Sequence, residues 1–97
     1  MTSYETIDLA VDKETAARSV AERVPHLRQV RSDDSIEFRT NVGLHLATLS
    51  DVTLASGPRG SRIRYRTSVI GPHLFHAHDK ARQIRESVER FRAPETR

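Results

Sequence analysis

Three stretches of the chain alternate polar and apolar residues, which is the pattern of a strand with one buried face. They are YETIDLAV near the N-terminus, SIEFRTNV in the middle and SRIRYRTSVI after residue 60. The third is the clearest of them, because its inward positions alternate with Arg62, Arg64 and Arg66 over residues 61–67. The predicted inward positions are Ile7, Leu9 and Val11, then Ile36, Phe38 and Thr40, then Ile63, Tyr65, Thr67 and Val69.

Two other segments repeat apolar residues at helical spacing. The first follows Asp12, a good N-cap residue, and carries Ala17, Val20, Ala21 and Val24 on one stripe. It should end near Arg23, because the residue before Pro25 disfavours helical geometry. The second opens at Gly71 and Pro72, and its stripe comprises Leu74, Ala77, Ala81, Ile84, Val88 and Phe91.

Two stretches between these elements leave alternatives open. HLRQV, residues 26–30, is either a connector or the start of a further strand. In GLHLATLSDVTLAS, residues 43–56, Leu49 is out of phase with its apolar neighbours, which a bulge near residues 49–51 or a break between two short strands would explain. GPRG, residues 57–60, predicts a turn.

These elements predict a two-layer α+β domain. We expect an antiparallel sheet of about four strands, an N-terminal helix and a long C-terminal helix, in the order β-α-β-β-β-α. A chain of 97 residues is enough for one domain, which we place at residues 1–92, with a disordered tail at 93–97.

Composition narrows the class of function only a little. There is no cysteine, so disulfides and thiolate chemistry are excluded. No segment resembles a membrane span or a signal peptide, so we expect a cytoplasmic protein without a membrane partner. The net charge of +3 comes almost entirely from arginine.

Three histidines in GPHLFHAHDKAR, residues 71–82, raise the question of a metal site. On a helix, His73 and His76 fall on one side and His78 emerges on the opposite shoulder. Three ligands in those directions cannot meet at one ion, and a catalytic zinc needs three. We therefore predict no metal and no cofactor.

Arginines form a second cluster, because Arg62, Arg64 and Arg66 occupy the outward face of one strand and Arg39 lies on another. This face is a candidate interaction surface, either for a second copy of the chain or for an anion. Single-strand nucleic-acid binders add exposed aromatic residues to such a face, whereas Tyr65 points inward. We therefore do not expect nucleic acid to be a partner, and a homodimer through this face or a sheet edge is the alternative.

Catalytic motifs are missing from the sequence. It contains no Gly-x-Ser-x-Gly, no Walker A and no Gly-x-Gly-x-x-Gly. We predict no catalytic residue and no enzyme activity.

The order of elements resembles a shortened helix-grip domain, the superfamily of the START and polyketide-cyclase-like proteins. TIDLAVDKETAARSVAERV resembles its opening strand and first helix. SRIRYRTSVIG followed by AHDKARQIRESVERF resembles its last strand and the long helix that the sheet grips. The resemblance implies a small hydrophobic ligand between the sheet and the C-terminal helix, although a full member has more strands.

The function expected from these features is a non-catalytic binding domain. Its ligand would be a small apolar molecule, and the residues expected to line its site are Phe38, Tyr65, Ala77 and Ala81. The alternatives are a homo-oligomeric interaction module that uses the open sheet face or an edge, and weak nucleic-acid binding through the arginine strand.

Overall fold

The structure is a computed structural model that describes residues 4–25, 27–31, 34–40, 48–69 and 74–94. Within these residues the chain forms five strands, two α-helices and one short 3-10 turn. In chain order they are β1 (Glu5–Leu9), α1 (Lys13–Arg23), β2 (Leu27–Arg31), β3 (Ser35–Thr40), β4 (Thr48–Gly57), β5 (Gly60–Val69), α2 (Leu74–Val88) and the 3-10 turn Glu89–Phe91.

All five strands form one antiparallel sheet in the order β1-β5-β4-β3-β2. The α+β class and the two helices are confirmed, and the sheet has five strands rather than four. The added strand is β2, which corresponds to the HLRQV stretch and pairs with β3.

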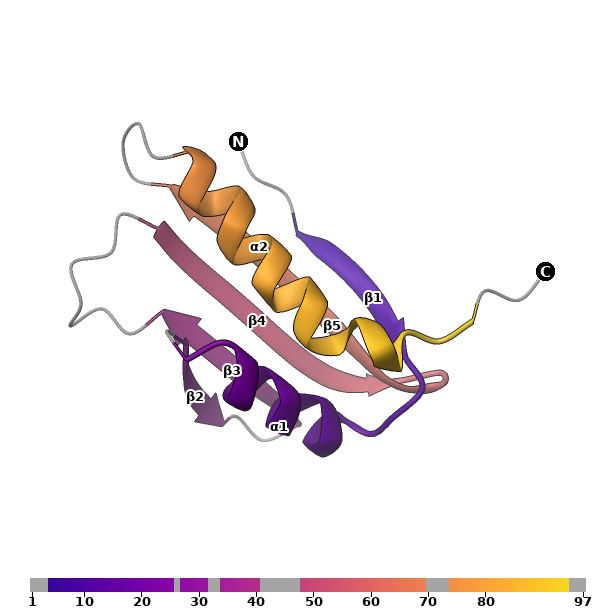
Figure 1. The fold of residues 1–97 in the computed structure, drawn as a ribbon. Helices are drawn as coiled ribbons and strands as arrows, with labels where there is room; N and C mark the ends of the chain where they lie inside the picture. Colours follow the sequence, from indigo (N-terminus) through magenta and orange to yellow (C-terminus); the bar gives the residue numbers. More distant parts are fainter. Residues whose placement is uncertain (1–3, 26, 32–33, 41–47, 70–73, 95–97) are drawn as a thin grey trace.

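Both helices lie on the same face of the sheet, with α2 over β4 and β5 and α1 over β3 (Figure 1). The core fills the space between the two layers. Its largest fully buried side chains include Tyr65, Phe38, Leu9, Ile36, Leu54, Ile63 and Ile84. The inward positions predicted on β3 and β5 are therefore core positions wherever their side chains are described.

α1 begins and ends as its sequence predicts. The Asp12 side chain accepts a hydrogen bond from the Thr15 amide at 3.0 Å, and the helix ends at Arg23. Its buried face differs slightly from the predicted stripe, because Ala16 and Ser19 are buried and Ala21 is exposed. The helix is turned so that Ala21 lies at the edge of the interface rather than inside it.

β4 is continuous. From Thr48 to Gly57 every residue pairs with β5 in one unbroken register, so no bulge occurs at residues 49–51. Residues 43–47 of the uncertain stretch lie outside the described residues. The predicted turn follows β4, with Gly57 paired to Gly60 across Pro58 and Arg59.

The C-terminal segment folds back onto β1. The Ala10 amide donates to the Phe91 carbonyl at 2.8 Å, and the Ala93 amide donates to the Asp8 carbonyl at 2.9 Å. Ala93, at the start of the expected tail, is buried. Residues 95–97 lie outside the described residues, so a tail there stays a prediction.

In the part of the chain that the structure describes, neither helix has the length and apolar character needed to cross a membrane.

Candidate functional site

The residues expected to bind a ligand lie in the core. Phe38 and Tyr65 are each 1% exposed, and Val52 lies between them in the same cross-strand row. Ala81 is partly buried and packs against this core from α2. Ala77 belongs to α2, but its side chain lies outside the described part. The structure thus places Phe38 and Tyr65 in the core, with Ala81 packed against it from the helix side, and a ligand among them stays a prediction.

The hydroxyl of Tyr65 is the polar end of this core side chain. It donates a hydrogen bond to Glu5 Oε2 at 2.5 Å, across the pair that joins β5 to β1. Burial raises the pKa of Tyr65 well above its usual value, and the hydrogen bond to the Glu5 carboxylate raises it further, while Arg85 on α2 opposes the shift. The neutral hydroxyl is therefore the form that the fold favours.

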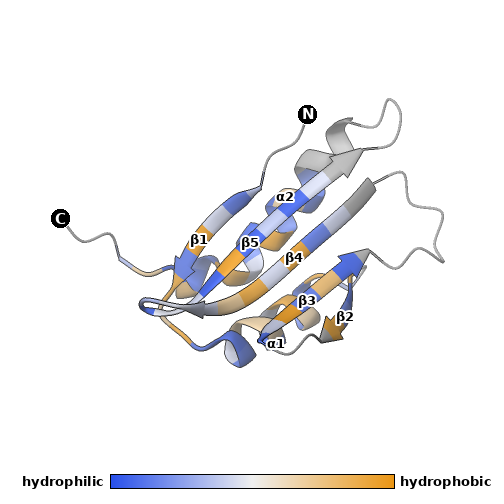
Figure 2. Ribbon diagram, turned by 180° about the vertical axis from the view of Figure 1, so that it is seen from behind, coloured by the Kyte–Doolittle hydropathy of each residue, from blue (hydrophilic) through white to orange (hydrophobic). Residues whose placement is uncertain are grey.

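The arginines predicted to form an interaction surface do share one face. Figure 2 shows the sheet from behind, on the side away from the helices, where hydrophilic and hydrophobic positions alternate along the strands. One cross-strand row on this face contains Arg28, Arg39, Asp51 and Arg66. Arg64 and Arg62 occupy the next two rows of the same face.

Most of this arginine face is paired with acidic side chains. Arg62 Nε lies 2.7 Å from Asp8 Oδ1, and Arg66 lies 3.2 Å from Asp51. Arg39 lies 3.6 Å from Glu37 on its own strand. The hydrogen bond from Arg62 lowers the pKa of Asp8 below its usual value. These pairs lie at the surface and are exposed or half-buried, and surface pairs contribute little to stability.

Tyr4 is a residue of this face that the sequence analysis did not place. Its ring centre lies 3.9 Å from the Arg64 guanidinium carbon and 4.6 Å from that of Arg66. Both distances are within the range of a cation–π contact. Tyr4 is the first residue of the alternating stretch YETIDLAV, whose period places it on the outward face, but the period of one strand does not show which strand lies beside it.

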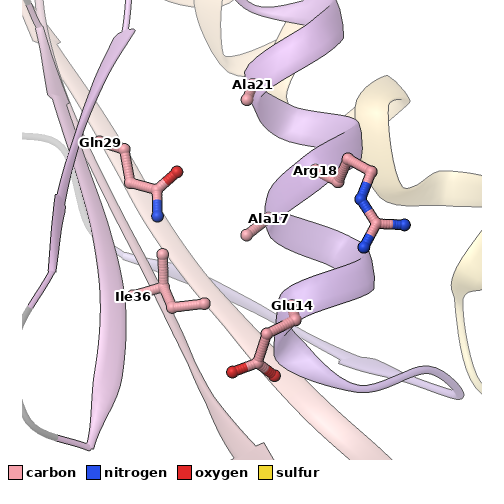
Figure 3. A pocket seen from close by; sticks show the side chains of 6 residues that line it. All are labelled: Glu14, Ala17, Arg18, Ala21, Gln29 and Ile36. Carbon is pink, nitrogen blue, oxygen red and sulfur yellow. The ribbon is translucent and has the colours of Figure 1, made fainter.

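A groove lies elsewhere, between α1 and the β2–β3 edge of the sheet (Figure 3). Its volume is about 340 Å³. The helix contributes Glu14, Ala17, Arg18 and Ala21, and the strands contribute Gln29 and Ile36.

The groove has an apolar floor and a polar rim. Figure 3 shows Ala17, Ala21 and Ile36 facing the space between helix and strands, with Gln29 reaching toward the helix. The Arg18 side chain points away from that space. Two alanines one helical turn apart leave the gap open, because a larger side chain at either position would fill it.

Sequence reasoning missed this groove for a specific reason. Ala21 was expected on the buried stripe, and β2 was left undecided, so neither wall could be placed. The available signals were the Ala17–Ala21 spacing and the polar Gln29 at an inward position of β2.

The three histidine side chains considered as metal ligands lie outside the described part of the chain. His73 lies there entirely, and so do the side chains of His76 and His78. Among the residues that are described, no three His, Asp or Glu side chains are grouped so that they could hold a metal ion.

Comparisons with known proteins add no relative. No protein-family model, no curated protein and no solved structure matches the chain.

Proposed function

We propose that the chain is a non-catalytic binding domain that holds a small amphipathic molecule in the groove between α1 and β2–β3. The observation that supports this proposal best is the groove itself. Its volume of about 340 Å³ lies within the range of small-molecule sites, roughly 300–1,000 Å³.

The lining favours a ligand with an apolar body and one polar group. Ala17, Ala21 and Ile36 offer an apolar surface, and the Gln29 amide carries both donors and an acceptor. A neutral group such as an amide or a hydroxyl would match Gln29. The groove proposal keeps the expected small ligand but moves it from α2 to α1.

The helix-grip interpretation remains a proposal beside this one. It is supported by the pairing of β1 with the last strand, β5, and by the position of both helices on one face. In that interpretation the ligand would lie between the sheet and α2, near Ala81.

A binding experiment distinguishes the two positions. The probe is the neutral dye N-phenyl-1-naphthylamine, an apolar molecule with one N–H group, titrated into the folded protein and followed by fluorescence. Ala21→Leu should weaken its binding at least roughly tenfold, which corresponds to about 1.4 kcal/mol. The matched control is Glu22→Leu, because Glu22 is the next residue of α1, is exposed and does not line the groove.

Each outcome has a meaning. Equal binding by Ala21→Leu and the wild type would refute the groove proposal. If Ala81→Leu abolishes binding and Ala21→Leu does not, the ligand lies between the sheet and α2, and the groove is not the site.

A further inference from the structure

The two edge strands of the sheet, β1 and β2, differ in the main-chain partners on their outer sides. On the outer side of β1, the Phe91–Ala93 segment supplies main-chain partners, and Leu9 forms a bridge with Arg92. β2 ends the sheet on the other side, and no further strand pairs with it among the described residues. An open edge of this kind is a template for pairing with another strand.

The main-chain direction along β2 follows from one hydrogen bond. The Leu27 amide donates to the Val24 carbonyl at 3.2 Å, outside the sheet, so it points away from β3. In an antiparallel pair the main-chain groups of successive residues point alternately toward and away from the neighbouring strand. Those of Gln29 and Arg31 therefore also point outward, and those of Arg28 and Val30 point toward β3.

We propose that β2 pairs with β2 of a second copy of this chain, antiparallel and across a two-fold axis at Gln29. The two Gln29 residues would exchange both of their main-chain hydrogen bonds. On each side of the axis, the outward Arg31 amide would donate to the Leu27 carbonyl of the other copy. The result is one continuous sheet with helices on the same face in both copies.

This register suits the charges of the strand. It places Arg28 opposite Val30 of the second copy, where the aliphatic part of the arginine can cover the valine. A register centred on Arg28 would instead place two guanidinium groups opposite each other, which is destabilising. The Gln29-centred register is also the one that pairs all five residues of β2 with their counterparts.

The strand is short, so the interface is small. Stable interfaces bury at least about 1,200 Å² in total, and pairing between two five-residue strands contributes only part of such an area. We therefore expect a dimer whose population depends on concentration in the micromolar range and above.

Proline provides a direct test. Gln29→Pro removes the outward amide hydrogen but no hydrogen bond to β3, and proline is tolerated on edge strands. The matched control is Gln29→Ala, which loses the same side chain and keeps the amide. Mass should rise with concentration for the wild type and for Gln29→Ala in light scattering or native mass spectrometry, and Gln29→Pro should stay monomeric.

A second measurement keeps the test valid if Gln29→Pro does not fold. In the wild-type protein, hydrogen exchange at the Gln29 amide should slow as concentration rises, while exchange at the Val30 amide, which points toward β3, should not change. A wild-type mass that stays monomeric at all concentrations would refute the proposal. So would a dimer that survives Gln29→Pro and is lost in Arg64→Glu, because the arginine face would then be the interface.

The dimer and the ligand groove are tested separately. Ala21→Leu changes the groove and leaves the β2 main chain intact, so it should alter dye binding without altering mass.

Discussion

The hydroxyl of Ser19 on α1 donates a hydrogen bond to the main-chain carbonyl of Ser87 on α2, and both residues are buried. Small side chains let the two helices approach closely, and this bond satisfies a carbonyl in the last turn of α2. Ser19→Ala should therefore destabilise the fold by about 1–3 kcal/mol, because the buried carbonyl loses its partner. Denaturant unfolding measures the change.

Ser87→Ala is the control for that prediction. The Ser87 hydroxyl donates to the Ile84 carbonyl within its own helix, and its removal leaves the bond between the helices in place. We expect a smaller loss than for Ser19→Ala. Equal losses would show that the bond between the helices has no special role.

Gly60 cannot accept a side chain. Its φ is +141°, and a Cβ atom there would lie 2.7 Å from the Val11 carbonyl oxygen. Gly60→Ala should cost about 1–3 kcal/mol from the backbone conformation alone, and the clash adds to that. The test compares the thermal unfolding midpoint of Gly60→Ala with that of Ser56→Ala, a substitution at an exposed position on the same hairpin. Equal midpoints for the two variants would contradict the prediction.

The N-cap of α1 predicts a dependence on acid pH. The hydrogen bonds from Thr15 lower the pKa of Asp12 below its usual 3.8. Because the folded-state pKa is the lower one, the stabilisation is present above pH 4 and is lost as pH falls through the folded value. Asp12→Ala should be less stable than the wild type at pH 7, and the difference should shrink toward pH 2.

Asn is the control at this position, because it caps helices well and does not titrate. Asp12→Asn should keep most of the stability at pH 7 and show less pH dependence than the wild type. A difference between Asp12→Ala and the wild type that is unchanged at pH 2 would contradict the capping role of the carboxylate.

Tyr65 predicts a dependence on alkaline pH. Its pKa is raised in the folded state, mainly by burial, so folding favours the neutral phenol. The stabilisation is full below pH 10, the ordinary value, and is lost as pH rises above it. The wild type should lose stability above pH 10 faster than Tyr65→Phe, as measured by denaturant midpoints from pH 8 to pH 11. Parallel curves for the two proteins would contradict the prediction.

The strands that alternate strictly could be predicted from the sequence, and the reason is physical. β3 and β5 have one buried and one exposed face, so Phe38 and Tyr65 could be placed in the core from their period alone. β2 could not be assigned in this way. Gln29 occupies an inward position but lines a groove, so β2 lacks the apolar alternation that marks a half-buried strand.

The arginine face and the groove also contain features that the sequence predicts and features that it does not. Arg62, Arg64 and Arg66 share a face because their spacing is two residues, which sequence alone reveals. The contact of Tyr4 with Arg64 and the gap between Ala21 and Gln29 depend on how separate elements pack. No local pattern encodes that packing, so the structure was needed to find both.

The strand order has a consequence for how the chain is made. Among the described strands, β1 pairs with β5 alone, so Glu5 has no cross-strand partner until Tyr65, sixty residues later, has been synthesised. During synthesis from the N-terminus, the first strand made is therefore without its partner until β5 has left the ribosome, and the Phe91–Ala93 segment that covers its other side emerges later still. The hairpins among β2 to β5 are local and can form earlier, so β1 joins the sheet last although it is synthesised before the other four described strands.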